Sequence, residues 1–473
     1  MTFTSAAPRG RLPLPRLLAF ATGSMPVWIL VTLMGVYIPR FYAGHIGISL
    51  IAVGGAIVFV RLTDLVIDLT IGWMMDKTST RFGRYRPWYA LGLPVLWIGA
   101  YKIVNPPTGA GVGYLVGWMI VLYVAYSILA LSHSAWAARL AGTYNERSRI
   151  FGWIQAMAVV GTSTMLALPL LTGGRINPAV SSTMGSVGWV LIGVATVVAA
   201  LTLFSAKEPI ATEIKKERAS LRDYMAVITT PSMYRLVLTT LFLVLGPAVT
   251  GPIYLFFFHD AKGFAFTVVN LLLIGYIAAG LVGAPAWAHV AQKLGKVRTV
   301  QLACVAYAIT QSVLMAIPAK LFWATFAGMF AVGFCASAFI FLIQAMMADV
   351  GDEIRLSTGK ERSGVLYAFI TMTQKFGASI TVSIIFPILA AVGYNAKEGV
   401  VNTPQAIRGL EMCYLFAPML LVLVGGALLF GYKLTPQRHG EIRSQLDALE
   451  AASFASAEAS LVGVAEEPPV AAE

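Results

Sequence analysis

Four charged residues lie deep inside apolar stretches of the sequence: Arg61, Asp64 and Asp68 in one stretch, and Lys375 in another. Two carboxylates four residues apart share one face of a helix, and such a pair attracts H⁺ or Na⁺. The two basic side chains would balance the carboxylates whenever no cation is bound. We therefore predict a cation-coupling site at these four residues, with Asp64 and Asp68 as the candidate Na⁺ ligands. The alternative is a structural salt-bridge network, which is a costly use of ionisable groups among apolar residues.

The composition explains why these charges are unusual. Hydrophobic residues make up 58% of the chain and charged residues only 12%, which is typical of a polytopic membrane protein. A helix needs about 20 apolar residues to cross a bilayer. On this criterion we predict an all-α membrane protein with twelve transmembrane helices, near residues 17–42, 47–75, 87–104, 112–138, 150–172, 184–205, 233–258, 266–291, 299–317, 321–347, 363–393 and 409–431.

Basic residues indicate the orientation of these helices. Most of the 34 Lys and Arg residues fall in alternate loops on the same side as both termini, and cytoplasmic loops carry such an excess. We expect a multi-pass protein of the plasma (bacterial inner) membrane with both termini in the cytoplasm. The net charge of +12 then indicates contact with anionic lipid and no nucleic-acid partner. The three cysteines lie in apolar stretches without paired spacing, which suggests neither a disulfide nor a metal site.

A short loop pattern recurs in the two halves of the sequence. The order basic, apolar, Gly, basic, any, basic occurs at residues 81–86 and again 212 residues later, at 293–298. A duplicated six-helix unit leaves such a repeat. We predict two pseudo-symmetric halves, 1–205 and 231–431, joined by a charged cytoplasmic linker at 206–230. Residues 432–473 are polar and then rich in Ala and Glu, so we expect a disordered cytoplasmic tail there.

The loop after the second predicted helix combines a small residue, a carboxylate and several basic side chains. Gly72 would let two helices approach closely, and Asp76 would place its carboxylate at the cytoplasmic helix end. The other members of this predicted cytoplasmic gate are Arg81, Gly83, Arg84 and Arg86. The sequence Gly-x-x-x-Asp-Lys at residues 72–77 resembles the signature of the major facilitator superfamily. That resemblance implies the major facilitator fold, with a midplane cavity and alternating access.

A longer resemblance runs from residue 61 to residue 88. This segment is similar to the second helix and following loop of the glycoside-pentoside-hexuronide:cation symporters. Residues 348–362 resemble that family's loop between its tenth and eleventh helices, and residues 371–377 resemble its eleventh-helix lysine segment. The resemblance therefore covers most of residues 15–431.

The resemblance implies roles for individual residues. The family's two cation-binding aspartates fall on Asp64 and Asp68, its second-helix arginine on Arg61 and its eleventh-helix lysine on Lys375. These are the four charges that the apolar background singles out. Its loop between the tenth and eleventh helices adds Asp349 and Arg362 to the predicted cytoplasmic gate.

Departures from the family bear on the substrate. Residues 17–39 lack the acidic residue of the sugar permeases, while Ser132 and Gln155 replace a family aspartate and arginine. Leu129 replaces a threonine cation ligand, which favours H⁺ over Na⁺ as the coupling ion. The predicted substrate contacts combine aromatic platforms with polar groups: Trp136, Ser132, His133, Gln155, Trp28 and Tyr37. Trp28 and Tyr37 could instead face lipid or anchor at the interface, and His133 could be a hydrogen-bonded helix residue.

These patterns favour a secondary active transporter. The first hypothesis is cation-coupled symport of a small organic solute, by family resemblance a glycoside or sugar acid. The alternatives are a transporter of an amphiphile such as a lysolipid and a transporter-like sensor. Nothing in the sequence resembles a nucleophile with its base, a metal-ligand spacing or a phosphate loop, so we expect no enzyme activity and no cofactor. The expected partners are the solute and the lipid bilayer, and the expected state is a monomer.

Overall fold

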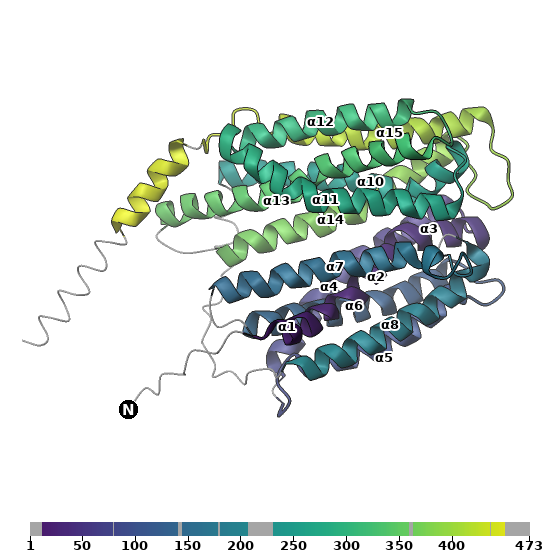
Figure 1. Cartoon of the computed structure of the whole chain (residues 1–473), viewed down its shortest axis with the longest axis horizontal. Helices are drawn as coiled ribbons and strands as arrows, with labels where there is room; N and C mark the ends of the chain where they lie inside the picture. Colours follow the sequence, from purple (N-terminus) through teal and green to yellow (C-terminus); the bar gives the residue numbers. More distant parts are fainter. Residues whose placement is uncertain are drawn as a thin grey trace, which may run out of the picture.

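The computed structural model describes residues 12–78, 80–140, 144–177, 180–206, 230–358, 363–435 and 437–449. Within these ranges every regular element is helical (Figure 1). The chain begins with a helical segment, residues 14–45, that is interrupted near Pro26 and Pro39, because proline cannot donate to the helical ladder. Its pieces are α1 (Leu14–Ala21), η1 (Thr22–Ser24), α2 (Met25–Thr32), η2 (Leu33–Tyr37), α3 (Ile38–Arg40) and η3 (Phe41–His45).

Longer helices complete the two halves. The N-terminal half continues with α4 (Leu50–Lys77), α5 (Arg86–Val104), α6 (Val112–Leu140), α7 (Tyr144–Leu171), η4 (Ser181–Thr183) and α8 (Met184–Ser205). The C-terminal half contains α10 (Pro231–Phe256), η5 (Phe257–Ala261), α11 (Phe266–Leu294), α12 (Lys296–Ala316), α13 (Phe322–Thr358), α14 (Ser363–Ala391) and α15 (Pro404–Ala427).

The length and composition of these helices fit a membrane. In the described part of the chain, eleven helical segments are long and apolar enough to cross a bilayer. The 19-residue α5 packs against α6 and α8 and completes a set of twelve. The predicted all-α class with twelve transmembrane helices is therefore confirmed.

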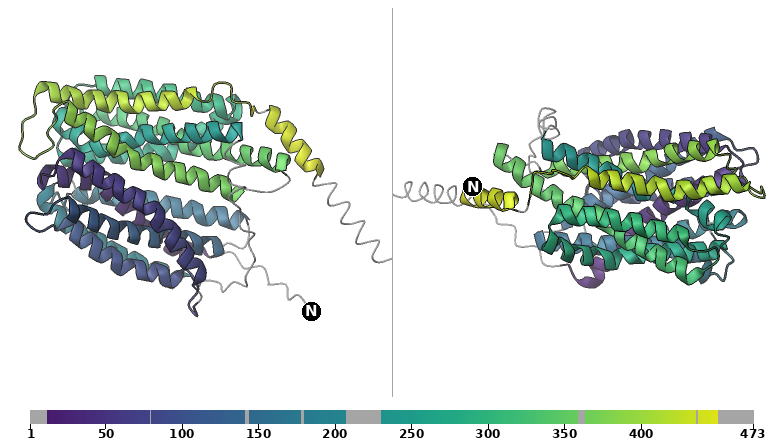
Figure 2. Two further views of the ribbon diagram at one scale, coloured as in Figure 1. Left: turned by 180° about the vertical axis from the view of Figure 1, so that it is seen from behind. Right: turned by 90° about the horizontal axis from the view of Figure 1, so that it is seen from above.

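The helices form two layers. Figure 1 shows residues 14–205 as a purple-to-blue layer beside a teal-to-yellow layer of residues 231–427, and Figure 2 shows the same division from behind. Helix α4 contacts α14 and α7 contacts α11 across the boundary, so these pairs join the halves. The end of the bundle that carries α3 and η3, with residues 257–265 and 391–403, is called the α3 end.

The repeated loops share a glycine with a positive φ angle. Gly83 and Gly295 occupy the same position of the repeat and have φ of 109° and 82°. Only glycine adopts such values without strain. The repeat therefore has a structural counterpart in both halves.

The region after α15 differs from the expected disordered tail of residues 432–473. Residues 437–449 form a helix, which buries Ile442 and Leu446. These two apolar positions are four residues apart and give the helix one buried face. Most of the predicted linker, residue 436 and residues 450–473 lie outside the described residues.

Candidate functional site

The predicted charged residues come from two helices of different halves. Arg61, Asp64 and Asp68 belong to α4, and Lys375 belongs to α14. Their spacing of three and four residues places the first three on one face of α4. Because α4 packs against α14, that face meets the other half.

Lys375 lies between the two carboxylates. Its Nζ atom contacts Asp68 Oδ2 and lies 3.7 Å from Asp64 Oδ2. The Asp64 residue is buried, and the side chain of Asp68 is 16% exposed. One ammonium group thus holds both carboxylates across the boundary between the halves.

Helix α6 supplies residues of the site that the sequence reasoning missed. Ser127 is buried and donates a hydrogen bond of 2.9 Å to Asp64 Oδ1. The guanidinium carbon of Arg61 lies 5.1 Å from the ring centroid of Tyr123, and Lys375 Nζ lies 5.9 Å from that of Tyr126. One feature of the sequence could have identified these residues. Tyr123, Tyr126 and Ser127 are three or four residues apart or adjacent, which places them at neighbouring positions of one helix.

Three buried polar atoms of the site have no hydrogen-bond partner among the described residues. They are Asp68 Oδ1, Arg61 Nε and the Tyr123 hydroxyl. Buried polar groups normally have partners, so such exceptions call for an explanation. The free carboxylate oxygen beside Lys375 is suited to accept a proton or to bind a cation.

Three of the predicted substrate contacts pack inside the N-terminal half instead of facing a cavity. Trp136 is fully buried, with its ring 5.0 Å from that of Phe20. Ser132 is buried and donates to Ile128 O, a carbonyl of its own helix. His133 is buried and bonds Phe20 O at 3.0 Å. The physical reason for the difference is that the Phe20 side chain of α1 packs against the rings of His133 and Trp136, which the aromatic and polar types do not reveal.

The other three predicted contacts have different surroundings. Tyr37 is buried and donates a 2.8 Å hydrogen bond to Asn270 of the other half. Trp28 is 38% exposed, and Gln155 on α7 is also exposed. The structure therefore does not gather the six predicted contacts into one pocket.

The predicted cytoplasmic gate loop is held by contacts within the N-terminal half. Arg81 lies over the Phe82 ring, Arg84 Nε donates to Thr78 O, and Arg86 Nη2 donates to Leu203 O. A Cβ atom at Gly72 would meet nothing within 4 Å, so the close helix approach expected there is absent from this conformation. Asp76 lies in α4, and Arg362 lies outside the described residues.

Asp349 forms ion pairs with the C-terminal half and with the helix that follows it. Lys296 Nζ lies 2.6 Å from Asp349 Oδ1. His439 of the helix at 437–449 lies 3.5 Å from Asp349 and 3.0 Å from Asp352. Lys296 occupies the position equivalent to Arg84 in the repeat, so the two repeated loops make different contacts.

Charged groups also join the halves at the α3 end. Arg40 Nη2 lies 3.5 Å from Asp260 Oδ1, and Tyr394 donates to the same carboxylate. Burial, and then the charge of Asp260, raises the pKa of the Tyr394 hydroxyl, so this group remains a donor. The Arg40 guanidinium also lies over the rings of Phe256 and Phe266.

Hydrogen bonds between uncharged groups also join the two halves at the α3 end. Asn270 accepts from Tyr37 and donates to Asn177 Oδ1 at 3.2 Å. The backbone amide of Glu398 donates to Gly44 O at 3.0 Å. The two halves are therefore held together at the α3 end in this conformation.

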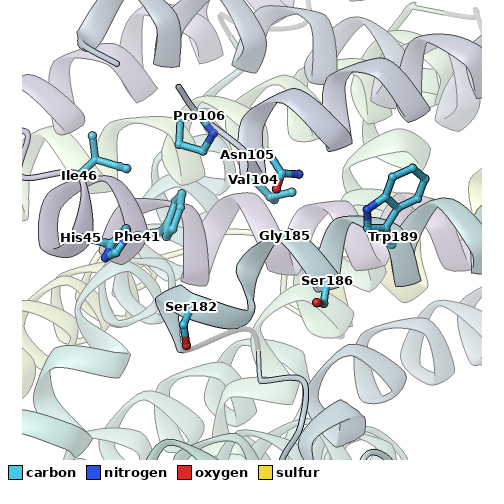
Figure 3. Close-up of a pocket in the computed structure, with 10 residues that line it drawn as sticks. All are labelled: Phe41, His45, Ile46, Val104, Asn105, Pro106, Ser182, Gly185, Ser186 and Trp189. Carbon is cyan, nitrogen blue, oxygen red and sulfur yellow. The ribbon is translucent and has the colours of Figure 1, made fainter. Parts of the chain in front are cut away.

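A cavity of about 530 Å³ also lies at this end (Figure 3). It is lined by elements of the N-terminal half only, including Phe41, Asn105, Ser186 and Trp189. Movement of one half against the other would not open or close it. It is therefore a poor candidate for the alternating-access site.

Comparison with known proteins gives related transporters over most of the chain. Residues 19–436 match the family described as MFS/sugar transport protein. The isoprimeverose transporter of Lactiplantibacillus pentosus is 25% identical over 421 residues, which cover 85% of each chain. The inner membrane symporter YicJ of Escherichia coli (strain K12) is 24% identical, covering 78% of this chain and 80% of YicJ. The glucuronide carrier protein homolog of the same strain is 21% identical, covering 87% and 90%.

Solved structures show the same fold. The nucleoside transporter NupG matches with a TM-score of 0.66 and 12% identity, over 88% of this chain and 98% of NupG. A bacterial homolog of the human lysosomal transporter Spinster, solved inward-facing and unoccupied, has the same TM-score and identity, over 88% and 96%. The major facilitator fold, the resemblance to the glycoside-pentoside-hexuronide symporters and the expectation of a transporter rather than an enzyme are confirmed. The chain belongs to the MFS/sugar transport protein family.

Proposed function

We propose that this protein couples the movement of a cation to the symport of a small glycoside or sugar acid by alternating access. The observation that carries the proposal is the placement of Lys375. Its ammonium group, from the C-terminal half, contacts Asp68 and lies 3.7 Å from Asp64 in the N-terminal half.

The geometry supports competition between Lys375 and the coupling cation. A cation that binds the carboxylates weakens their attraction for the ammonium group. Lysine is a flexible point charge, so its side chain can move away and pair elsewhere. Because this contact joins α4 to α14, its loss would change the energy of the interface between the halves and so link cation binding to their movement.

The substrate class rests on the relatives. One is an isoprimeverose transporter and another a glucuronide carrier homolog. These names favour a sugar or sugar acid over a lysolipid. The protein would carry it across the plasma (bacterial inner) membrane, with both termini in the cytoplasm.

The coupling ion is H⁺ or Na⁺. Loss of the family's threonine at Leu129 favours H⁺, whereas the structure adds the Ser127 hydroxyl as an oxygen next to Asp64. With both carboxylates, this oxygen improves the supply of hard ligands that a small cation needs. Sodium is therefore better supported by the structure than by the sequence.

The test is thermal unfolding of the purified chain with isoprimeverose, lactose, methyl glucuronide or a lysophospholipid, each with and without Na⁺ at several pH values. A ligand at 100 times its dissociation constant should stabilise the native state by about 2.7 kcal/mol. We expect stabilisation by a sugar or glucuronide, enhanced by Na⁺ or by lower pH. Stabilisation by the lysophospholipid alone would contradict the proposal.

A further inference from the structure

An apolar groove lies between α1 and α8 on the surface of the N-terminal half. Its volume is about 580 Å³, within the range of about 300 to 1,000 Å³ that is usual for small-ligand sites. We call it the α1–α8 groove, defined by Arg16 and Ala19 of α1 and by Val197, Ala200, Leu201 and Phe204 of α8. Figure 1 shows α1 toward the end of the bundle opposite the α3 end. The groove therefore lies away from the contacts that join the halves there.

The shape of the groove suits an extended hydrocarbon chain. Val197, Leu201 and Phe204 lie on one face of α8 and are 62%, 48% and 86% exposed. That face runs for about 10 Å along the helix. The short side chains of Ala19 and Ala200 leave room beside it. Because α8 is long and apolar enough to cross a bilayer, this exposed face meets lipid acyl chains.

Arg16 is the charged residue among the eight that line the groove. It is exposed in the first turn of α1 and has no hydrogen bond, ion pair or ring contact among the described residues. A guanidinium group matches the geometry of a phosphate and binds it through two parallel hydrogen bonds. One end of an apolar groove thus carries an available cation.

Contacts with α7 hold the start of α1 in place. The backbone amide of Leu12 donates to Glu146 Oε1 at 3.1 Å, and Arg149 Nη1 donates to Leu12 O at 3.0 Å. Glu146 also pairs with Arg149 at 3.2 Å, so its charge is already balanced. The backbone of α1 is therefore fixed before a ligand binds, and binding need order only the Arg16 side chain.

The combination of groove and cation defines the class of ligand. A free phosphate would gain nothing from the apolar lining, and a neutral lipid would gain nothing from Arg16. The proposed orientation places this end of the bundle in the cytoplasmic leaflet, which contains anionic lipids. A basic residue near such a surface contributes about 1 kcal/mol, or about a fivefold gain in affinity.

We propose that the α1–α8 groove binds one acyl chain of an anionic phospholipid whose phosphate pairs with Arg16. This site shares no residue with the Asp64, Asp68 and Lys375 cluster, and it does not depend on which solute the protein carries. A lipid that bridges α1 and α8 stabilises the folded N-terminal half, since it binds the native arrangement of the two helices.

Two substitutions test the two parts of the site separately. Arg16→Gln removes the charge and leaves the groove open. Arg298→Gln is its control, because Arg298 is an exposed basic residue in the first turn of α12. Ala200→Phe fills the groove and leaves the charge. Its control is Ala324→Phe, at an exposed position of α13.

The measurement is native mass spectrometry of each full-length variant in detergent, titrated with dioleoyl phosphatidylglycerol or dioleoyl phosphatidylcholine. The two lipids have the same chains and differ in net charge. We expect the unmodified protein to bind one phosphatidylglycerol about fivefold more tightly than phosphatidylcholine. Arg16→Gln should reduce this preference to within about twofold. Ala200→Phe should weaken binding of both lipids about tenfold or more, and both controls should match the unmodified protein within about twofold.

Four results would overturn the proposal. The first is equal affinity of the unmodified protein for the two lipids, and the second is an undiminished preference in Arg16→Gln. The third is displacement of phosphatidylglycerol by inorganic phosphate, which would show a phosphate site that does not use the groove. The fourth is a dimer of the unmodified protein that Ala200→Phe abolishes, because a second copy of the chain would then cover the groove.

Discussion

At the scale of single residues, the central feature is one ammonium group shared by two carboxylates. Lys375 contacts Asp68 and approaches Asp64 to 3.7 Å, while Arg61 lies over the Tyr123 ring. The two cations thus have different tasks. Arg61 is held by a neighbour within its own half, whereas Lys375 pairs with carboxylates of the other half.

Replacing Lys375 by Ala should strengthen cation binding. The carboxylates would lose their competing ammonium, so the cation affinity should rise at least about fivefold, a coupling of about 1 kcal/mol. Thermal unfolding of the purified protein, titrated with Na⁺ and with pH, measures this. The stabilisation midpoint should move to lower Na⁺ concentration or to higher pH. Lys397→Ala, at an exposed loop position, should not move it, and an unmoved midpoint in Lys375→Ala would refute the competitor role.

The charged residues could be predicted from the sequence, and their neutral partners could not. Asp64 and Lys375 stand out because a charge among apolar residues is costly enough to require a reason. Ser127 and Asn270 do not stand out, since single neutral polar residues are common in helices and their partners depend on tertiary packing. For the same reason Trp136 was predicted to line the cavity, although it proves to be buried against Phe20.

At the scale of elements, close helix contacts depend on small residues. A Cβ atom at Gly333 of α13 would lie 2.2 Å from Tyr276 O of α11. Only glycine lets the two backbones approach to this distance. The number and class of the helices followed from apolar length, whereas this contact depends on how two helices cross, which their sequences do not specify. The helix at 437–449 was missed because its short apolar stripe is set in a polar segment.

Gly333→Ala should therefore destabilise the C-terminal half. An added methyl group that meets backbone atoms costs about 1 to 3 kcal/mol, since neither helix can yield without repacking. A lowered unfolding temperature in detergent would show this. Gly117→Ala is the control, because a Cβ atom there meets nothing within 4 Å. Equal unfolding temperatures for both variants would mean that α11 and α13 do not pack this closely.

At the scale of the whole molecule, the contacts correspond to one of the two states that the proposed alternating-access cycle requires. The halves are joined at the α3 end by the Tyr37 and Asn270 side chains and by the Arg40 and Asp260 pair. The positive-inside pattern predicts that this end faces outward. The conformation is then closed to the outside, and transport requires these contacts to break.

Tyr37→Phe should shift the molecule toward its outward-open state. Loss of one buried hydrogen bond is worth about 0.5 to 1.5 kcal/mol, a shift of roughly two- to tenfold in the ratio of states. Labelling of a cysteine at Val36 by an impermeant thiol reagent, applied outside cells, should become faster by that factor; the native cysteines are buried. Tyr114→Phe removes a hydrogen bond within the N-terminal half and should leave the rate unchanged. A slower or equal rate in Tyr37→Phe would contradict the assignment.

The most direct test of the account is gradient-driven uptake by Asp68→Asn in proteoliposomes. The unmodified protein should accumulate radiolabelled isoprimeverose above its outside concentration when an inward H⁺ or Na⁺ gradient is imposed. Asp68→Asn removes a carboxylate that Lys375 contacts, so it should still exchange sugar by counterflow but never accumulate it, since sugar movement is no longer tied to the cation. Full gradient-driven accumulation by Asp68→Asn would contradict the claim that Asp64, Asp68 and Lys375 form the coupling site.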